Sequence, residues 1–256
     1  MSGIVVLSGF ICFQGPNLWT EWQALKQERL SSQDSVVIGY PNISPNPSFA
    51  EVPKNWYHEE GEIAMLWACW EKEQGHRWYT IGAGEIDPDR LRGPLGRDVI
   101  RAIDEAIVEV GGGTYWQRIP DMHQIAMLEV DGTATGYPLR ILQKVEVVND
   151  LIDDRAYLVV YSPFVSPEQA LNVYEGSLEG HRLTMGLSGY LSNRRAMLYD
   201  RRTESLWVEQ GADLIAQAGP LKGARLRRLA RPELIDWKEW KSSHPTGRLV
   251  VGADRS

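Results

Sequence analysis

The residue types that carry most enzyme and metal chemistry are present in this sequence but lack the required spacing. The two cysteines, Cys12 and Cys69, form neither a C-x-x-C pair nor the spacing of a zinc site. The serines lie outside any G-x-S-x-G nucleophile elbow. No H-x-x-x-H pair occurs among the histidines, which are His58, His76, His123, His181 and His244. We therefore expect no catalytic residue, no metal site and no bound cofactor.

Two clusters of charged residues contain side chains that could bind a cation or form ion pairs. Asp150, Asp153 and Asp154 could hold a cation through their carboxylates, but they flank an expected turn, which favours solvated turn residues. The segment from Asp200 to Glu204 contains carboxylates and arginines that can form charge-assisted hydrogen bonds. We expect this second cluster to be a structural ion-pair network that holds a strand end.

The composition is that of a globular protein, and the charge argues against nucleic-acid binding. The chain has 256 residues, of which 43% are hydrophobic and 24% charged, and its net charge is -7. A chain this acidic is a poor non-specific ligand for nucleic acid. Residues 1–180 are strongly acidic and residues 181–256 are basic. This division indicates either internal pairing or separate docking faces.

The elements that must position these residues are mostly short strands. Runs rich in β-branched and aromatic residues are separated by turn sequences such as Asp131-Gly132. The apolar run 63–70 is a buried strand or short helix with a candidate hairpin partner at 77–81. Helical spacing is found at 98–110 and again from Pro232 to His244. The remaining expected strands are 124–130, 133–137, 156–161, 170–174, 182–187, 196–200 and 248–251.

These elements predict a mainly β fold with a few helices, built as a β-sandwich or barrel-like core and α+β in detail. We expect a domain at 81–256, preceded by a Trp- and Pro-rich N-terminal extension at 1–80. Six of the ten tryptophans lie in the first 78 residues, and the segment 41–53 holds four prolines. Because tryptophan is enriched at protein interfaces, this region has the composition of a docking extension.

The first residues raise the question of membrane contact. The apolar run 4–13 is far shorter than the roughly 20 residues that a transmembrane helix needs. It is either a buried first strand or a segment that enters a membrane or a partner's apolar groove. We expect a peripheral membrane protein on a side of the membrane that the sequence leaves undetermined. The absence of the basic start and cleavage site of a signal peptide slightly favours the cytoplasmic face. The expected partner-contacting residues here are Phe10, Phe13, Trp19, Trp22 and Trp56.

Several segments in the second half resemble a known prokaryotic family. The most specific are YPLRIL at 137–142 and YDRRTESLW at 199–207. They occur in order with EVVND at 146–150, GLSG at 186–189, and GPLKG at 219–223. Together with WKEW at 237–240, these segments resemble the family known as domain of unknown function 3179, over about residues 86–251.

The resemblance also shows where this chain departs from the family. Members usually carry a histidine directly before the glutamate of the EVVND segment, where this chain has Val145. They usually carry a Cys-Pro-Leu-Cys stretch where this chain has Ser162 to Val165. A histidine with two cysteines could ligate a metal or perform thiol chemistry, whereas valine has no lone pair and a serine hydroxyl is a poor metal ligand. The resemblance therefore implies that any such centre has been lost here.

The resemblance implies a polar pocket, and the composition of the C-terminal part implies a docking face. Arg225, Arg227 and Arg228 belong to a basic segment that either contacts a partner or anionic lipid or forms a solvated face. The polar residues of the family segments that could line a ligand pocket are Arg140, Glu146, Asn149, Asp150, Asn193, Asp200, Arg201 and Glu204.

These observations lead to one functional hypothesis and one alternative. We expect a non-catalytic interaction subunit that binds protein subunits of a larger complex, with contact to a membrane surface and none to nucleic acid. Its expected role is that of a membrane-extrinsic accessory protein stabilising a respiratory or photosynthetic assembly. The alternative is a small-ligand-binding protein or enzyme that uses the polar residues of the family segments.

Overall fold

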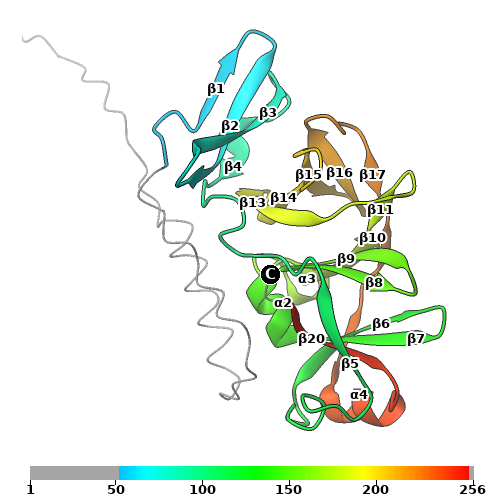
Figure 1. The fold of residues 1–256 in the computed structure, drawn as a ribbon. Helices are drawn as coiled ribbons and strands as arrows, with labels where there is room; N and C mark the ends of the chain where they lie inside the picture. The colour runs from blue at the N-terminus through cyan, green and yellow to red at the C-terminus, as the bar shows by residue number, and fades with distance from the viewer. Residues whose placement is uncertain (1–51, 254–256) are drawn as a thin grey trace, which may run out of the picture.

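The computed structural model describes residues 52–253, and these form a stack of β-sheets (Figure 1). Sheet A is antiparallel with strand order β1-β2-β3, comprising β1 (Tyr57–Glu60), β2 (Ile63–Glu71) and β3 (Gly75–Gly82). The apolar run at 63–70 is thus a strand, and its hairpin partner is the expected one. The expected extension boundary at residue 80 falls within β3, and the division into two parts stays a prediction.

Sheet B has the strand order β17-β16-β15-β14-β13-β4 and is antiparallel throughout. A single 3-10 turn, η2 (Pro88–Arg90), leads into its edge strand β4. Its strands are β4 (Leu91–Arg92), β13 (Met185–Ser192), β14 (Arg195–Asp200), β15 (Leu206–Gln210), β16 (Asp213–Ala218) and β17 (Arg225–Leu226).

Sheet C has the order β18-β10-β9-β8 and lies in the middle of the stack. A small separate hairpin, β11 (Ser177–Leu178) with β12 (His181–Arg182), follows β10. The strands of sheet C are β8 (Val147–Ile152), β9 (Arg155–Tyr161), β10 (Leu171–Glu175) and β18 (Arg228–Ala230).

Sheet D has the order β19-β6-β7-β20-β5, with β20 parallel to β7. The helices among the described residues are α2 (Leu139–Val145), α3 (Pro167–Ala170) and α4 (Trp237–Ser243). The strands of sheet D are β5 (Ala106–Val110), β6 (Gln124–Val130), β7 (Thr133–Pro138), β19 (Glu233–Asp236) and β20 (Arg248–Ala253).

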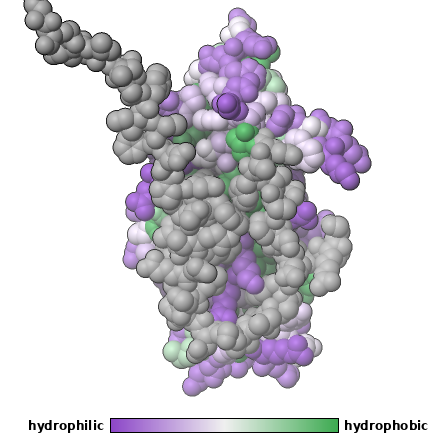
Figure 2. Space-filling model, turned by 90° about the vertical axis from the view of Figure 1, so that its left-hand side faces the viewer, coloured by the Kyte–Doolittle hydropathy of each residue, from purple (hydrophilic) through white to green (hydrophobic). Residues whose placement is uncertain are grey.

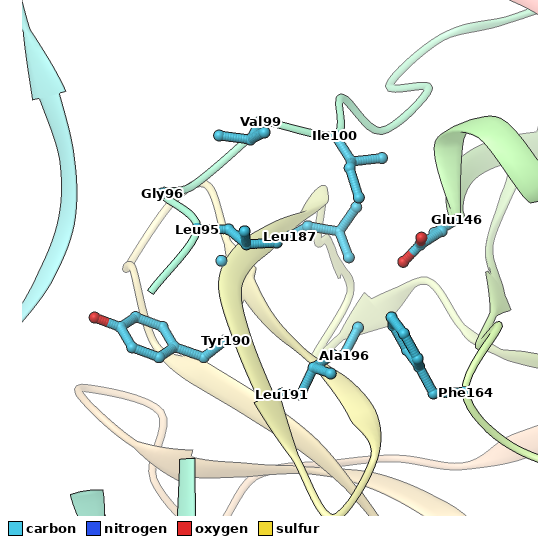
Figure 3. A pocket seen from close by; sticks show the side chains of 11 residues that line it. Leu95, Gly96, Val99, Ile100, Glu146, Phe164, Leu187, Tyr190, Leu191 and Ala196 are labelled. Carbon is cyan, nitrogen blue, oxygen red and sulfur yellow. The ribbon is translucent and has the colours of Figure 1, made fainter. Parts of the chain in front are cut away.

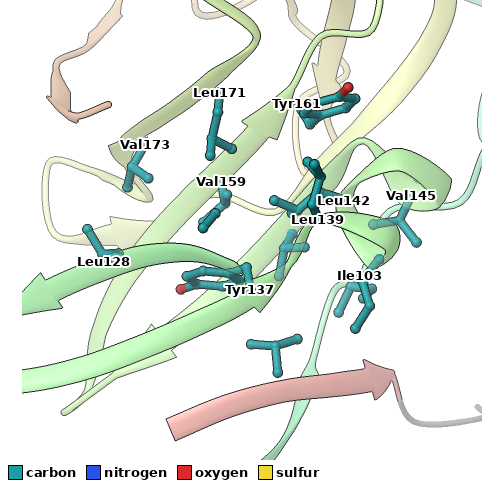
Figure 4. Close-up of a cluster of buried hydrophobic side chains, with 14 of the residues drawn as sticks. Ile103, Leu128, Tyr137, Leu139, Leu142, Val145, Val159, Tyr161, Leu171 and Val173 are labelled. Carbon is teal, nitrogen blue, oxygen red and sulfur yellow. The ribbon is translucent and has the colours of Figure 1, made fainter. Parts of the chain in front are cut away.

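The strands of the central sheet are apolar on both sides because both of its faces are covered. In β9, Leu158 packs into a cluster shared with sheet B, which contains Trp207. The next residue, Val159, points to the opposite face and packs with Tyr137 of sheet D (Figure 4). This arrangement explains why β9 is a continuous apolar run instead of an alternating one. The mainly β sandwich architecture is confirmed, with more layers than two.

Two expected helices differ from the observed elements. The segment 98–110 is not helical, because Ile103 forms a parallel bridge with Val148 and β5 pairs with β20. The helix expected from Pro232 begins later, at Trp237, because β19 pairs with β6 before it. In both cases pairing with a distant strand overrides the local periodicity. The elements expected before residue 52 lie outside the described residues.

A strap formed by residues 93–104 joins three of the sheets. The backbone N–H of Arg97 donates to the carbonyl of Ala68 in sheet A at 2.7 Å. That of Asp98 donates to Leu187 in sheet B at 2.9 Å, and that of Ile103 to Val147 in sheet C at 2.9 Å. The chain thus crosses the layers once in an extended form, and its backbone groups hold them in register.

On the face of the molecule seen in Figure 2, the described residues at both ends of the stack are mostly hydrophilic. Part of the charge division found in the sequence is internal pairing. Arg201 bonds to Asp98 at 2.7 Å, Arg227 to Glu175, and Lys222 to Glu85. Basic residues of the last part of the chain therefore neutralise carboxylates contributed by the earlier part.

The carboxylate of Glu85 fastens the end of sheet A to the end of sheet B. It accepts hydrogen bonds from the N–H groups of Gly82 (2.9 Å) and Gly219 (3.0 Å) and pairs with Lys222 at 3.1 Å. Partial burial acts to raise the pKa of Glu85, but the two N–H groups and the Lys222 ammonium outweigh it and lower the pKa. The ionised form is therefore stabilised by folding.

Replacing Glu85 by Gln should lower the free energy of unfolding by about 1–3 kcal/mol at neutral pH, because the two N–H groups then have only a neutral acceptor and the Lys222 ammonium loses its ion pair. A pKa that is lower in the folded state gives stability above the unfolded value, and this stability is lost as the pH falls through the folded value. The difference between wild type and Glu85→Gln should therefore shrink on acidification, as measured by urea unfolding across pH. Glu60→Gln, on the exposed edge of sheet A, is the control. A difference independent of pH would contradict this role.

Beyond sheet D, a tryptophan cluster closes the stack. The rings of Trp237 and Trp240 are stacked with centroids 5.3 Å apart, and Trp116 meets Trp237 edge-on at 4.9 Å. Both α4 tryptophans are fully buried, and they pack with Ile125 and Leu249 of sheet D. This cluster supplies the apolar cover for the outer face of the sheet.

Truncation of Trp237 to Ala should lower the free energy of unfolding by about 3–5 kcal/mol, as for other buried aromatic residues. Met122→Ala is the matched control, since Met122 is 75% exposed and should change stability by less than about 0.5 kcal/mol. Urea titration followed by far-UV circular dichroism measures both. If both variants lowered the free energy of unfolding by the same small amount, the tryptophan cluster would not be important for stability.

Candidate functional site

The polar residues expected to form one ligand pocket are distributed over several places and are used in internal hydrogen bonds. Asn149 of β8 is buried between sheets B and C. Its amide nitrogen donates to the carbonyls of Met185 (2.9 Å) and Ile103 (3.2 Å) and to Asp104 Oδ1 (3.1 Å). Its carbonyl oxygen accepts from the backbone N–H of Met185 at 2.8 Å. This amide therefore connects two sheets and the strap.

Asp150 follows on the same strand and faces the opposite side, toward sheet D. Its carboxylate accepts the hydroxyl of Tyr137 at 2.8 Å and pairs with Arg248 at 3.3 Å. Burial, and then the neighbouring Asp150 carboxylate, raise the pKa of Tyr137 well above its ordinary value. The tyrosine thus stays a neutral donor, and the group ties sheet C to sheet D.

Asp200 is buried at the end of β14 and organises the turn that follows. It accepts from the backbone N–H of Thr203 (2.7 Å), from the Thr203 hydroxyl, and from the indole of Trp207 (3.1 Å). This is the turn network predicted for the segment 200–204. Both oxygens of the carboxylate accept hydrogen bonds that hold the end of the strand.

Arg201 and Glu204 attach this same turn to the strap. Arg201 pairs with Asp98 at 2.7 Å and with Asp104 at 2.9 Å. Glu204 pairs with Arg97 at 2.6 Å. Burial raises the pKa of the Asp104 carboxyl, against the opposing effect of the Arg201 guanidinium. These ion pairs fix the position of the strap over sheet B.

The remaining three residues of the expected pocket lie apart. Asn193 is exposed in the β13–β14 turn, where its positive φ of 50° suits an asparagine. Arg140 lies in the first turn of α2. Glu146 is buried at the left-handed C-terminal end of α2 and lines a cavity (Figure 3).

The cavity beside Glu146 is small and apolar. Its volume is about 30 Å³, and its walls include Val99 and Ile100 of the strap, Phe164, and Leu187 of sheet B. A volume of this size holds one or two water molecules, whereas ligand pockets span about 300–1,000 Å³. The cavity therefore has a buried carboxylate but no room for a metabolite.

Val145, Ser162 and Val165, the positions at which the resemblance leads us to expect a histidine and two cysteines, are buried or partly buried. Val145 is 3% exposed and belongs to the cluster between sheets C and D. Val165 packs against the same cluster. The backbone N–H of Ser162 donates to the carbonyl of Ala170 at 2.7 Å. The two valines thus make apolar contacts in the core, and Ser162 takes part in a backbone hydrogen bond.

A larger groove of about 510 Å³ lies elsewhere, at the ends of sheets B and C. Its walls come from the β8–β9 turn, the β11–β12 hairpin and the β17–β18 segment. The charged residues that line it are Asp154, Arg155, Glu175, Glu179, Arg182, Arg225 and Arg227, and the apolar ones include Leu151 and Leu229. This volume is that of a ligand or peptide site.

The groove contains part of the docking face expected from the sequence. Arg225 and Arg227 line it, whereas Arg228 lies on β18 and its backbone N–H donates to Asp213 at 3.0 Å. Trp56 is half-buried and packs on Tyr190, with ring centroids 5.8 Å apart. Phe10, Phe13, Trp19 and Trp22 lie outside the described residues.

Sequence reasoning missed the groove residues Arg182, Leu151 and Leu229. Their types and spacing are ordinary, and they meet only because three separate turns converge. Within residues 52–253 no group of three or more His, Cys, Asp or Glu side chains has a metal-binding arrangement. Over the same residues no helix is both long and apolar enough to cross a membrane.

Replacing Asn149 by Leu should lower the free energy of unfolding by about 3 kcal/mol or more, because it leaves buried carbonyl and N–H groups without partners. Asn193→Gly is the matched control, since glycine accepts the same positive φ and should change stability by less than about 0.5 kcal/mol. Thermal and urea unfolding of both variants test this. Near-equal stabilities would show that Asn149 is not a structural tie.

The comparison with known proteins identifies the lineage of this domain. A family model described as "Protein of unknown function (DUF3179)" matches residues 97–256. Neither the curated proteins nor the solved structures yielded a match. The matched span contains sheets C and D, all of sheet B except β4, and most of the strap. With more than half of its length matched, the chain belongs to this family of unknown function.

Proposed function

We propose that this chain is a non-catalytic interaction protein that binds other protein subunits as a membrane-extrinsic accessory component of a larger complex. The observation that carries the proposal is the internal use of the polar residues in the family segments. The internal hydrogen bonds of three of them, Asn149, Asp150 and Asp200, join sheets or hold a turn. Side chains with these internal partners have few donors and acceptors left for a substrate, which supports a structural role.

The alternative, a small-ligand-binding protein or enzyme, has one observation in its favour. Glu146 presents a buried carboxylate beside a cavity, and such groups occur in catalytic sites. The cavity volume of about 30 Å³ and its apolar walls oppose this alternative. The structure thus supports a scaffold more strongly than a reaction centre.

The part of the chain outside the family match supports the docking role. The family match begins at residue 97, so sheet A and the Trp-rich first residues precede it. Sheet A shares a hydrophobic cluster with sheet B, in which Leu66 and Tyr79 pack with Leu206. A partner that binds the N-terminal part would therefore also be attached firmly to the family domain. A respiratory or photosynthetic membrane complex is the assembly that we propose.

Extraction of native membranes with a gentle detergent, followed by native size separation and detection of this chain, tests the proposal. We expect the chain to co-migrate with a large complex that survives a high-salt wash. Migration as a free protein of 28.9 kDa in the soluble fraction would contradict it. Native mass spectrometry of the purified chain provides the second readout, since a stoichiometric bound ligand or metal would favour the alternative.

A further inference from the structure

The groove at the ends of sheets B and C contains an arginine whose charge is not matched by a carboxylate. Arg182 ends the β11–β12 hairpin, and its Nη2 atom donates to the backbone carbonyls of Asp104 at 2.8 Å and Asn149 at 3.2 Å. Among the described residues, no Asp or Glu oxygen lies within 4.0 Å of its guanidinium nitrogens. The side chain is therefore held in place by neutral acceptors and retains a full positive charge.

A guanidinium fixed in this way is suited to bind a carboxylate. It has five N–H donors, and the two on Nη2 are directed at carbonyls, so that those on Nε and Nη1 remain for a ligand. Each of these remaining N–H groups can donate one charge-assisted hydrogen bond to a carboxylate oxygen. Because Arg182 is already ordered, binding costs it little side-chain entropy.

The surroundings of Arg182 add further positive charge and apolar surface. The side chains of Arg225 and Arg227 are 61% and 65% exposed, and each pairs with one carboxylate, Asp213 and Glu175 respectively. Each guanidinium has further N–H groups beyond those in its ion pair, so both arginines can also donate to a ligand in the groove. Leu151 and Leu229, each 42% exposed, supply apolar contacts on the same groove.

These features favour a short protein segment over a polyanion. Asp154, Glu175 and Glu179 line the groove beside its arginines, so it offers no continuous basic surface to extended nucleic acid or to a layer of anionic lipid headgroups. A peptide can place one carboxylate at Arg182 and aliphatic side chains against the leucines. Arginine is also enriched among interface hot spots.

We propose that this groove binds a segment of a partner subunit that contains Asp or Glu next to aliphatic residues such as leucine. A side-chain carboxylate of that segment binds Arg182. This inference rests on the proposed function, because it specifies the chemistry of the partner that the interaction protein binds.

In the test, each variant of the full chain replaces the wild-type chain in its native host. Complexes are then extracted with detergent and separated by size under native conditions. Arg182→Gln and Leu229→Asp should each reduce the amount of chain in the large complex by about tenfold or more, the effect of losing a hot spot. Leu229→Asp changes an exposed side chain, so it keeps the test valid if Arg182→Gln folds poorly. The controls are Arg101→Gln and Val110→Asp, exposed residues outside the groove.

The chemistry of the partner is read by photocrosslinking. A photoreactive amino acid at position 229 of the full chain should crosslink a peptide that contains Asp or Glu next to aliphatic residues, identified by mass spectrometry. Crosslinks to lipid, to nucleic acid or to a basic segment would overturn the inference, as would unchanged complex formation by both groove variants. If wild type itself migrates as a free protein, the proposed function fails together with the inference. If wild type enters the complex and the groove variants do too, the inference alone fails.

Discussion

The buried amide of Asn149 is the contact on which most of the architecture depends. It sits on the central sheet, holds the backbone of Met185 in sheet B by two hydrogen bonds, and binds Ile103 and Asp104 of the strap. A buried amide costs several kcal/mol if left unsatisfied, so this position tolerates one arrangement of its neighbours. The separation of sheets B and C, and the path of the strap between them, follow from it.

The same contact explains why the groove has an ordered arginine. The carbonyl of Asn149 accepts from Arg182, and so does the carbonyl of Asp104, whose carboxylate receives the Asn149 amide. The structural tie and the proposed docking residue are therefore neighbours in one hydrogen-bond network. The side chain of Asn149 holds sheet B to sheet C, and its backbone carbonyl helps to position the charged guanidinium of Arg182.

A stack of sheets offers docking sites at its ends more readily than inside. Both faces of sheets B, C and D are covered by apolar clusters, so that the interior has little open volume, as the cavity beside Glu146 shows. The turns at the sheet ends are free of this constraint. The 510 Å³ groove lies at such an end, where three turns meet.

Much of the fold could be predicted from local sequence, but the site could not. The strand 124–130 is found with the expected bounds, because a short, mostly apolar run that ends at the Asp131-Gly132 turn favours a strand. The family resemblance was likewise confirmed, since it depends on short conserved-looking segments such as 199–207 and not on contacts. The segment 98–110 was predicted wrongly, because its helical spacing is weaker than the pairing of Ile103 with Val148 and of β5 with β20.

The sequence by itself determined the strand content, the family and the absence of familiar catalytic spacings, since these are properties of neighbouring residues. The tertiary structure decided what the polar residues do. Asn149 and Asp150 are adjacent in sequence, yet the alternation of a strand sends one to sheet B and the other to sheet D. Arg182 and Leu229 are far apart in sequence and share a groove only because their turns converge. Such meetings depend on long-range packing, which no local pattern encodes.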